Sequence, residues 1–247
     1  MNVLALDTTV RDGSVALVVD DRIIHERRGD RSRSHAERLP SELVTVAVKH
    51  GVALADVDVF AVAAGPGSFT GLRIGIATVQ GLAFVDNRRV VAVSALEALA
   101  QLASSGLAAG AIVAAWIDAQ RHDVYAALYR VSDAAEWTPE RVTSIMGPRV
   151  GDPTAILRDS AHDGVTPDVC IGDGSVRYAD VIRQASPGTR IVETPLLAGA
   201  IGRMAAVRAQ RGEAVDPAAI QPLYVRRPDT EVDRERRSVK EGTAERR

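Results

Sequence analysis

The 247-residue sequence predicts an α/β protein built from two halves of similar design. Short runs rich in Val and Ile alternate with helical patterns along most of the chain, which is typical of α/β folds. Each half also begins with strand-like runs joined by tight turns, and then continues with alternating strands and helices. This order indicates a duplicated architecture, although sequence identity between the halves is too weak to define a repeat.

The first half is expected to contain three strands and then helix, strand, helix, strand and helix. Asp12-Gly13 and Asp20-Asp21 supply the turns between the first strands. Ser34 and Glu37 have the spacing of a capping box at the start of the first helix. The expected elements run over 2–9, 14–21, 22–29, 34–50, 57–65, 70–85, 88–94 and 95–103.

The second half follows a hinge-like stretch, "SSGLAAG", and opens with a hairpin whose turn lies near Arg121-His122. Its middle, rich in Pro and Gly, is expected to be irregular. The expected elements run over 111–120, 123–131, 154–161, 168–174, 176–185, 190–194 and 198–212. We expect a first lobe at 1–103, a second at 104–197, a C-terminal segment at 213–226 and a charged, disordered tail at 227–247.

Composition excludes several classes of protein. The formal net charge of −2 argues against a broad basic surface that grips nucleic acid without help. The single Cys170 excludes an internal disulfide framework and a cysteine-based zinc cluster. The N-terminus lacks the order of a signal peptide, and no apolar run reaches the ~20 residues of a membrane helix. We therefore expect a cytoplasmic protein that does not associate with membranes.

The stretch "AVAAGPGSFTGLRIGIATVQGLAF", residues 61–84, resembles a phosphate-binding loop before a helix. It fails the Walker A pattern because Gly71 is followed by Leu72 and Arg73, not by Lys and a hydroxyl residue. It fails the dinucleotide fingerprint because Gly65, Gly67 and Gly71 are spaced one residue too long. The loop is therefore not predicted to be a standard nucleotide site.

Three glycines, Gly71, Gly75 and Gly81, lie within the helix that follows this loop. A glycine inside a helix costs about 1 kcal/mol relative to alanine. Close approach of another backbone would offset that cost. The residues leave two alternatives open: packing on the protein's own sheet, or docking of a helix from a partner.

Several segments together carry a family resemblance: "LALDTT", "RSHAERLPSEL", "AVAAGPGSFTGLRIGIATVQGLA", "VVAVSALEALA", "IDAQRHDVYAALY" and "PLYVRR". In this order they resemble the TsaB (YeaZ) family, non-catalytic paralogues of TsaD in bacterial tRNA threonylcarbamoyladenosine biosynthesis. The resemblance covers most of residues 1–226. It implies an ASKHA (actin-like ATPase) fold of two RNase-H-like lobes, with the helix at 198–212 returning to the first lobe.

The resemblance also bears on metal and nucleotide sites. TsaD-type proteins hold a metal ion with an H-x-x-x-H pair, and Ser94 and Ala98 stand at the corresponding spacing here. No metal site and no catalytic residue are therefore expected.

The family's two phosphate loops are only partly retained. The first keeps Asp7, Thr8, Thr9 and Gly13, and the second keeps Asp118. The second loop, however, places bulky residues at 120–122, where small ones would let a phosphate approach the backbone. These loops leave room for weak ATP or ADP binding, but not for a competent kinase.

The function implied is that of a scaffold subunit. It would form a heterodimer with TsaD, recruit the ATPase TsaE and help to present tRNA, while threonylcarbamoyl is transferred to the adenosine next to the anticodon of ANN-decoding tRNAs. The same face could also join two copies of the chain. The candidate interface residues are Gly71, Ile74, Gly75, Thr78, Leu39 and Leu43.

Two other functions are weighed against it. One is an ASKHA small-molecule kinase or ATPase, which would need a Gly-rich second phosphate loop. The other is a protease acting on its paralogue, with Ser68 as nucleophile. "GPGSF" is not the G-x-S-x-G motif, and the sequence places no histidine as its base.

Overall fold

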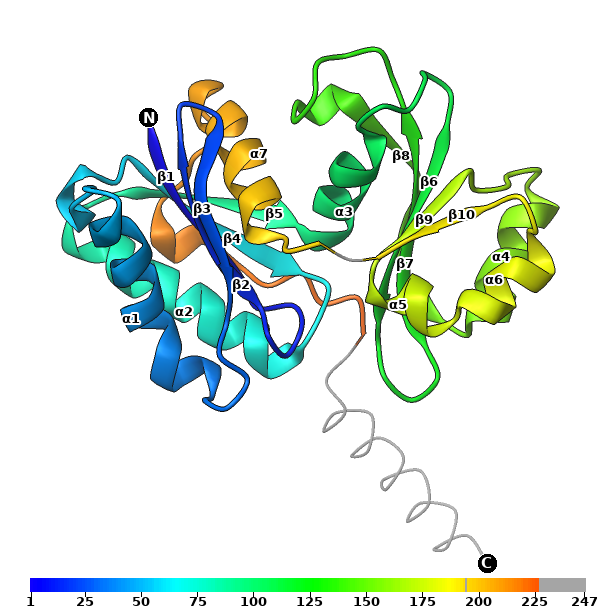
Figure 1. The fold of residues 1–247 in the computed structure, drawn as a ribbon, viewed down its shortest axis with the longest axis horizontal. Helices are drawn as coiled ribbons and strands as arrows, with labels where there is room; N and C mark the ends of the chain where they lie inside the picture. Colours follow the sequence, from blue (N-terminus) through cyan, green and yellow to red (C-terminus); the bar gives the residue numbers. More distant parts are fainter. Residues whose placement is uncertain (194, 227–247) are drawn as a thin grey trace, which may run out of the picture.

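The computed structural model describes residues 1–193 and 195–226, which form two α/β lobes side by side (Figure 1). The tail at 227–247, for which disorder is predicted, lies outside the described residues. No helix in the described part of the chain is both long and apolar enough to cross a membrane.

The first lobe is built on a five-stranded sheet of order β3-β2-β1-β4-β5. β1 pairs antiparallel with β2 and parallel with β4, so the N-terminal meander is continued by two parallel strands. The strands are β1 (Asn2–Asp7), β2 (Ser14–Val19), β3 (Arg22–Arg28), β4 (Val59–Gly65) and β5 (Arg89–Ser94).

The second lobe repeats this design with a sheet of order β10-β9-β6-β7-β8. Its first strand, β6, again pairs antiparallel with the next strand and parallel with the fourth. The strands are β6 (Ile112–Asp118), β7 (Val124–Val131), β8 (Val142–Gly151), β9 (Val169–Ile171) and β10 (Arg190–Val192). The matching strand orders confirm the duplicated α/β architecture and agree with the expected ASKHA fold of two RNase-H-like lobes.

Helices cover both faces of each sheet. On the outer face of the first sheet lie α1 (His35–Lys49) and α2 (Phe69–Val85), and on that of the second lie α4 (Pro153–His162) and α6 (Ala179–Ala185). Between the sheets, α7 (Ala198–Gln210) packs on β1, β2 and β4, whereas α3 (Ala95–Ser104) packs mainly on β6, β7 and β8. One continuous apolar core therefore joins the two lobes through α3 and α7.

The structure differs from the sequence prediction at two places in the second lobe. The stretch expected to be irregular contains β8, an edge strand in which Gly147 and Pro148 are tolerated because one side of the strand has no partner. The helix expected at 176–185 is divided at Tyr178 into α5 (Asp173–Arg177) and α6.

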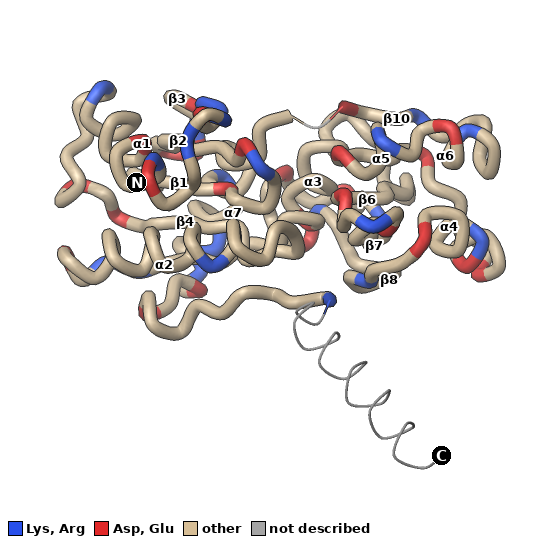
Figure 2. Tube along the Cα trace, turned by 90° about the horizontal axis from the view of Figure 1, so that it is seen from below, with Lys and Arg blue, Asp and Glu red and all other residues tan. Residues whose placement is uncertain are grey.

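The segment at 213–226, which we call the C-terminal strap, runs beneath α2 toward the second lobe (Figure 2). Val215 forms an antiparallel bridge with Val90, and the N–H of Leu223 donates to the carbonyl of Ala64 at 2.7 Å. At its end Arg226 donates to the carbonyl of Ala119 at 2.9 Å, in the β6–β7 loop. The strap therefore ties the first lobe to a loop of the second.

Candidate functional site between the lobes

A cavity of about 950 Å³ opens where the two lobes meet. It is lined by the loop after β1, the start of α1, the start of α2, the β6–β7 loop and the C-terminal strap. Thr9 and Asp118, two of the residues predicted to contact nucleotide, line this cavity. The structure thus brings the two predicted phosphate loops to one place.

The first loop is closed tightly by its own hydrogen bonds. The buried Asp7 carboxylate accepts from the N–H of Thr9 at 2.8 Å and from its hydroxyl at 2.6 Å. Burial raises the pKa of Asp7 above its ordinary value. Gly13 has a φ of +59°, and a Cβ there would lie 2.3 Å from the Asp7 carbonyl oxygen. Only glycine fits at position 13 of this turn, and the hydrogen bonds of Asp7 to Thr9 stabilise the turn.

In the second loop, the carboxylate of Asp118 is occupied by hydrogen bonds and an ion pair within the chain. Asp118 forms an ion pair with Arg177 at 2.9 Å and accepts from the N–H and the side-chain amide of Gln120, each at 3.0 Å. Gln120, Arg121 and His122 all have left-handed φ values, of 59°, 53° and 69°. Such a conformation costs a non-glycine residue roughly 1–2 kcal/mol. The bulky side chains therefore stand where a phosphate-binding loop would favour glycine.

A third carboxylate, Asp173, was not anticipated from the sequence. It follows β9 and accepts from the N–H of Asp118 at 3.0 Å and of Gly174 at 2.9 Å. Burial raises its pKa. Gly172, at φ +116°, would place a Cβ 1.9 Å from the Trp116 carbonyl oxygen. The "IGDG" run directly after a strand was the signal that could have identified this turn.

These carboxylates do not form a metal centre in the described residues. No group of three or more His, Cys, Asp or Glu side chains in residues 1–193 and 195–226 has an arrangement that could hold a metal ion.

The glycines at the start of α2 pack against the first loop. A Cβ on Gly71 would lie 2.3 Å from the carbonyl oxygen of Thr8, and one on Gly75 would lie 2.3 Å from the Thr8 hydroxyl oxygen. Gly67 is equally close to Thr9, at 2.6 Å from its Cβ. Of the two alternatives, close approach within the chain accounts for Gly71 and Gly75.

The predicted partner interface therefore needs correction. Gly71 and Gly75 are buried against Thr8, and Leu39 and Leu43 are fully buried in the core between α1 and the first sheet. These four residues do not form a surface, because the apolar stripe of a helix that covers a sheet faces that sheet. Ile74 and Thr78, by contrast, are only partly buried, on the solvent side of α2.

An apolar surface does exist on the solvent side of the same two helices. In α2 the only charged residue is Arg73, and Phe84 and Val85 are 81% and 77% exposed. Gly81 lies on this side with no atom within 4 Å of a built Cβ. We call this surface the α1–α2 face; it consists of Pro40, Val44, Val48, Ile74, Ala77, Thr78, Gly81, Phe84 and Val85.

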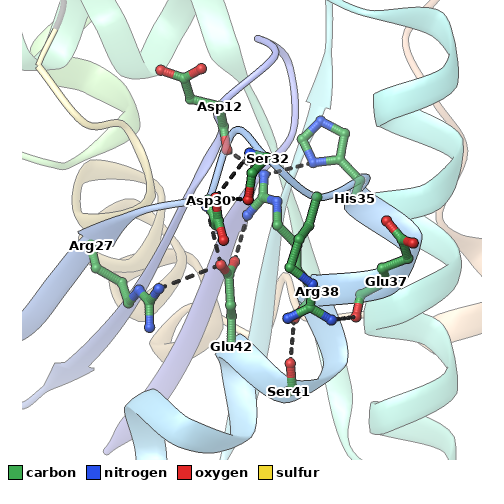
Figure 3. Close-up of polar contacts among 10 residues, drawn as sticks. Asp12, Arg27, Asp30, Ser32, His35, Glu37, Arg38, Ser41 and Glu42 are labelled. Carbon is green, nitrogen blue, oxygen red and sulfur yellow. Dashed lines mark hydrogen bonds and ion pairs between the residues drawn. The ribbon is translucent and has the colours of Figure 1, made fainter.

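Helix α1 is linked to the cavity by a buried polar cluster (Figure 3). Arg38, 1% exposed, forms an ion pair with Glu42 at 2.5 Å and donates to the carbonyl of Asp12 in the first loop. Its guanidinium also contacts Nδ1 of His35 at 2.8 Å. His35 thus takes part in a structural cluster at the helix start, where the N–H of Ser34 donates to Glu37 at 2.8 Å and completes the predicted cap.

Ser68 has a structural role in the described chain. It is the N-cap of α2, and its hydroxyl accepts from the N–H of Gly71 at 3.2 Å. In the described part of the chain, no histidine is hydrogen-bonded to it. The arrangement gives no support to a protease.

Comparisons with known proteins identify the family. A family model described as "TsaD: tRNA N6-adenosine threonylcarbamoyltransferase" matches residues 24–185. The "tRNA threonylcarbamoyladenosine biosynthesis protein TsaB" of Haemophilus influenzae is 30% identical over 92% of this chain and 94% of the relative. The Escherichia coli protein of the same name is 34% identical, over 61% of this chain and 64% of the relative, less than two thirds of its length.

Solved structures agree with this. "YeaZ from Pseudomonas aeruginosa" is 32% identical with a TM-score of 0.69, over 90% of this chain and 99% of that one. An activator of 2-hydroxyisocaproyl-CoA dehydratase from Clostridium difficile, 11% identical with a TM-score of 0.52, shares the fold alone over 86% of this chain and 97% of that one. From the family match, the relatives and the shared fold together, we conclude that this chain belongs to the TsaB (YeaZ) family.

Proposed function

We propose that this chain is an accessory, non-catalytic subunit in tRNA threonylcarbamoyladenosine biosynthesis, and that it forms a heterodimer with TsaD. The names of its relatives supply the pathway. The observation that carries the heterodimer is the α1–α2 face: a surface helix with one charged residue exposes apolar side chains to water. A helix pair from a paralogue of the same fold has the shape and polarity to cover it.

The second phosphate loop supports the non-catalytic part of the proposal. A kinase or ATPase needs a carboxylate free to act through magnesium and a backbone that phosphate can approach. Here Asp118 is bonded to Arg177 and Gln120. Recruitment of TsaE and presentation of tRNA are further parts of the proposal, and membership of the family supports them.

Gly81→Arg tests the heterodimer. The new side chain projects into open space, so the isolated chain should fold normally, while a charge in the middle of the α1–α2 face should abolish co-purification with TsaD. The matched control is Gly188→Arg, at an equally open glycine between α6 and β10. Co-purification of the Gly81→Arg chain at the level of the control would disprove the interface.

Reconstituted tRNA modification with and without the chain tests the accessory role. We expect modification to require the chain, and the purified chain to show no ATP hydrolysis. Full modification in its absence would contradict the proposal. Light scattering of the isolated chain tests whether two copies associate; if they do, Gly81→Arg should yield a monomer.

A further inference from the structure

The loop between β7 and β8 (132–141) reaches from the second lobe to α7, which packs on the sheet of the first lobe. Both carboxylate oxygens of Glu140 accept from the guanidinium of Arg211 at the end of α7, at 2.6 and 3.0 Å. The guanidinium carbon of Arg203 lies 4.3 Å from the centroid of the Trp137 ring, within the range of a cation–π contact. We call these four residues the interlobe clasp.

On the side of the second lobe, the loop is held in one conformation. Gln101 of α3 accepts from the N–H of Trp137 at 3.1 Å and donates to the carbonyl of Thr138 at 2.7 Å. Arg141 donates to the carbonyl of Ser104, at the end of α3, at 2.7 Å. Trp137 is 7% exposed and has a left-handed φ of 67°, which persists in a residue other than glycine only where the surroundings impose it. The clasp therefore starts from a fixed loop.

On the side of the first lobe, ion pairs and a hydrogen bond hold α7, which lies beside α3 between the two sheets (Figure 1). Arg203 pairs with Asp21 in the β2–β3 turn at 3.1 Å. Arg208 donates to the carbonyl of Ala92 in β5 at 3.3 Å and pairs with Glu97 of α3 at 2.6 Å. A shift of one lobe against the other would therefore disturb contacts along α7.

The C-terminal strap fastens the lobes at a second place. Arg226 donates to the carbonyl of Ala119 at 2.9 Å and pairs with Asp123, both in the β6–β7 loop. On the first lobe, Nε of Arg73 donates to the hydroxyl of Tyr224 at 2.8 Å. Tyr224 and Arg226 line the cavity, whereas no residue of the β7–β8 loop, which the structure describes throughout, does so. The clasp and the strap thus connect the lobes at separate places.

Proteins that close two lobes around a ligand do so by a hinge or by sliding of packed helices, and both motions need connections that yield. Here the connections are the clasp, the strap and the continuous apolar core at α3 and α7. We propose that the interlobe clasp and the C-terminal strap hold the two lobes at one separation, so that the cavity keeps the same opening as ligands or partners bind. The cavity and the α1–α2 face then move as one rigid body. This inference does not depend on the proposed accessory role.

The test is double electron–electron resonance on the full chain, with spin labels on Lys49→Cys at the exposed end of α1 and on Gly188→Cys between α6 and β10. Burial raises the pKa of the Cys170 thiol to about 12, so the label should not react with it. The measurement is made at neutral pH, where Glu140 is ionised because hydrogen bonds from Arg211 lower its pKa to about 2. We expect one narrow distribution of distances between the labels.

The clasp is then removed by substitution. Glu140→Ala removes the pair with Arg211, and Trp137→Gly removes the ring at a φ that suits glycine. In the double variant the distance distribution should broaden, and hydrogen exchange in the β7–β8 loop should become faster. The matched control is Asp180→Ala, which removes an exposed carboxylate paired with Arg183 inside α6 and should leave the distribution narrow. If circular dichroism shows that the double variant is unfolded, Glu140→Ala alone makes the test, because the Glu140 side chain is 58% exposed.

A broad or two-peaked distribution in the chain with an intact clasp would overturn the fixed separation. A distribution that stays equally narrow when the clasp is removed, or equal broadening in the control, would show that the clasp does not hold the lobes. Neither outcome decides the accessory role, because the requirement for the chain in reconstituted modification is measured separately.

Discussion

Substitution by alanine is expected to have opposite effects on stability at two glycines of α2, Gly81 and Gly75. Replacing Gly81 by Ala adds a methyl group in open space, so the chain should gain helix propensity of up to about 1 kcal/mol. Replacing Gly75 by Ala places Cβ 2.3 Å from the Thr8 hydroxyl oxygen and 3.0 Å from its methyl carbon. Overpacking of this kind costs about 1–3 kcal/mol, which exceeds the gain in propensity.

Thermal unfolding followed by circular dichroism measures the difference. For a chain of this size, 1 kcal/mol corresponds to a shift in Tm of roughly 2–4 °C. The Gly81→Ala chain should therefore melt a few degrees above the wild type and the Gly75→Ala chain below it. Equal stabilisation by both substitutions would show that Gly75 does not pack against Thr8.

A double-mutant cycle with Thr8→Ala sharpens this test. Removing the Thr8 hydroxyl and methyl leaves only its Cβ, at 3.2 Å from the new Cβ of Gly75→Ala, so the two substitutions should couple favourably by about 0.5–3 kcal/mol. The clash at Gly71 is with the Thr8 carbonyl oxygen, which Thr8→Ala retains. Gly71→Ala should therefore stay destabilising in both backgrounds. Rescue of Gly71→Ala, or failure to rescue Gly75→Ala, would refute the assigned contacts.

Three further predictions concern charged groups. Arg38→Met leaves Glu42 buried without its main partner, so urea unfolding should show a loss of about 3–5 kcal/mol; a loss below 1 kcal/mol would contradict the buried pair. Because burial raises the folded-state pKa of Asp7, its contribution to stability is full below the ordinary value of 3.8 and is lost as pH rises through the folded pKa. As the pH rises above 3.8, the Tm of the wild type should therefore fall relative to the Tm of Asp7→Asn. Parallel curves of Tm against pH would disprove the raised pKa of Asp7. Arg226→Ala removes the ion pair with Asp123 and should speed hydrogen exchange in the C-terminal strap with little change in Tm; unchanged exchange would show that the pair does not hold the strap.

Most of the fold could be predicted because its elements carry strong local signals. The capping residues Ser34 and Glu37 and the apolar run of β4 define their elements without reference to the rest of the chain. β8 was missed because an edge strand tolerates Pro148 and Gly147, residues that normally indicate a loop. Its strand character comes from pairing with β7, which a local pattern cannot show.

Most residues of the candidate site could be named from the sequence, but the residues that they contact could not. The sequence indicated that glycines in α2 require a close neighbour, yet only the fold shows that Thr8 is that neighbour. The helical spacing of Leu39 and Leu43 fits a partner interface and the core equally well, and the fold places both residues in the core. Asp173 was missed because its importance depends on the N–H of Asp118, 55 residues earlier in the chain.

The hydrogen bonds of the loop between β1 and β2 give a structural reason why a fold shared with nucleotide-binding proteins suits the proposed scaffold role. A phosphate loop needs free N–H groups, whereas here the N–H of Thr9 is bonded to Asp7 at 2.8 Å. The carbonyl of Thr9 accepts a hydrogen bond from the N–H of Ser68 at 2.8 Å. The hydroxyl of Ser14, the first residue of β2, accepts from the N–H of Ala198 at 3.0 Å. The loop thus fixes the start of α2 and, through Arg38, it also fixes α1, whereas Ser14 fixes the start of α7. The polar groups of the loop position the helices that carry the α1–α2 face, so the bonds that occupy the N–H of Thr9 and those that support the proposed partner surface belong to the same loop.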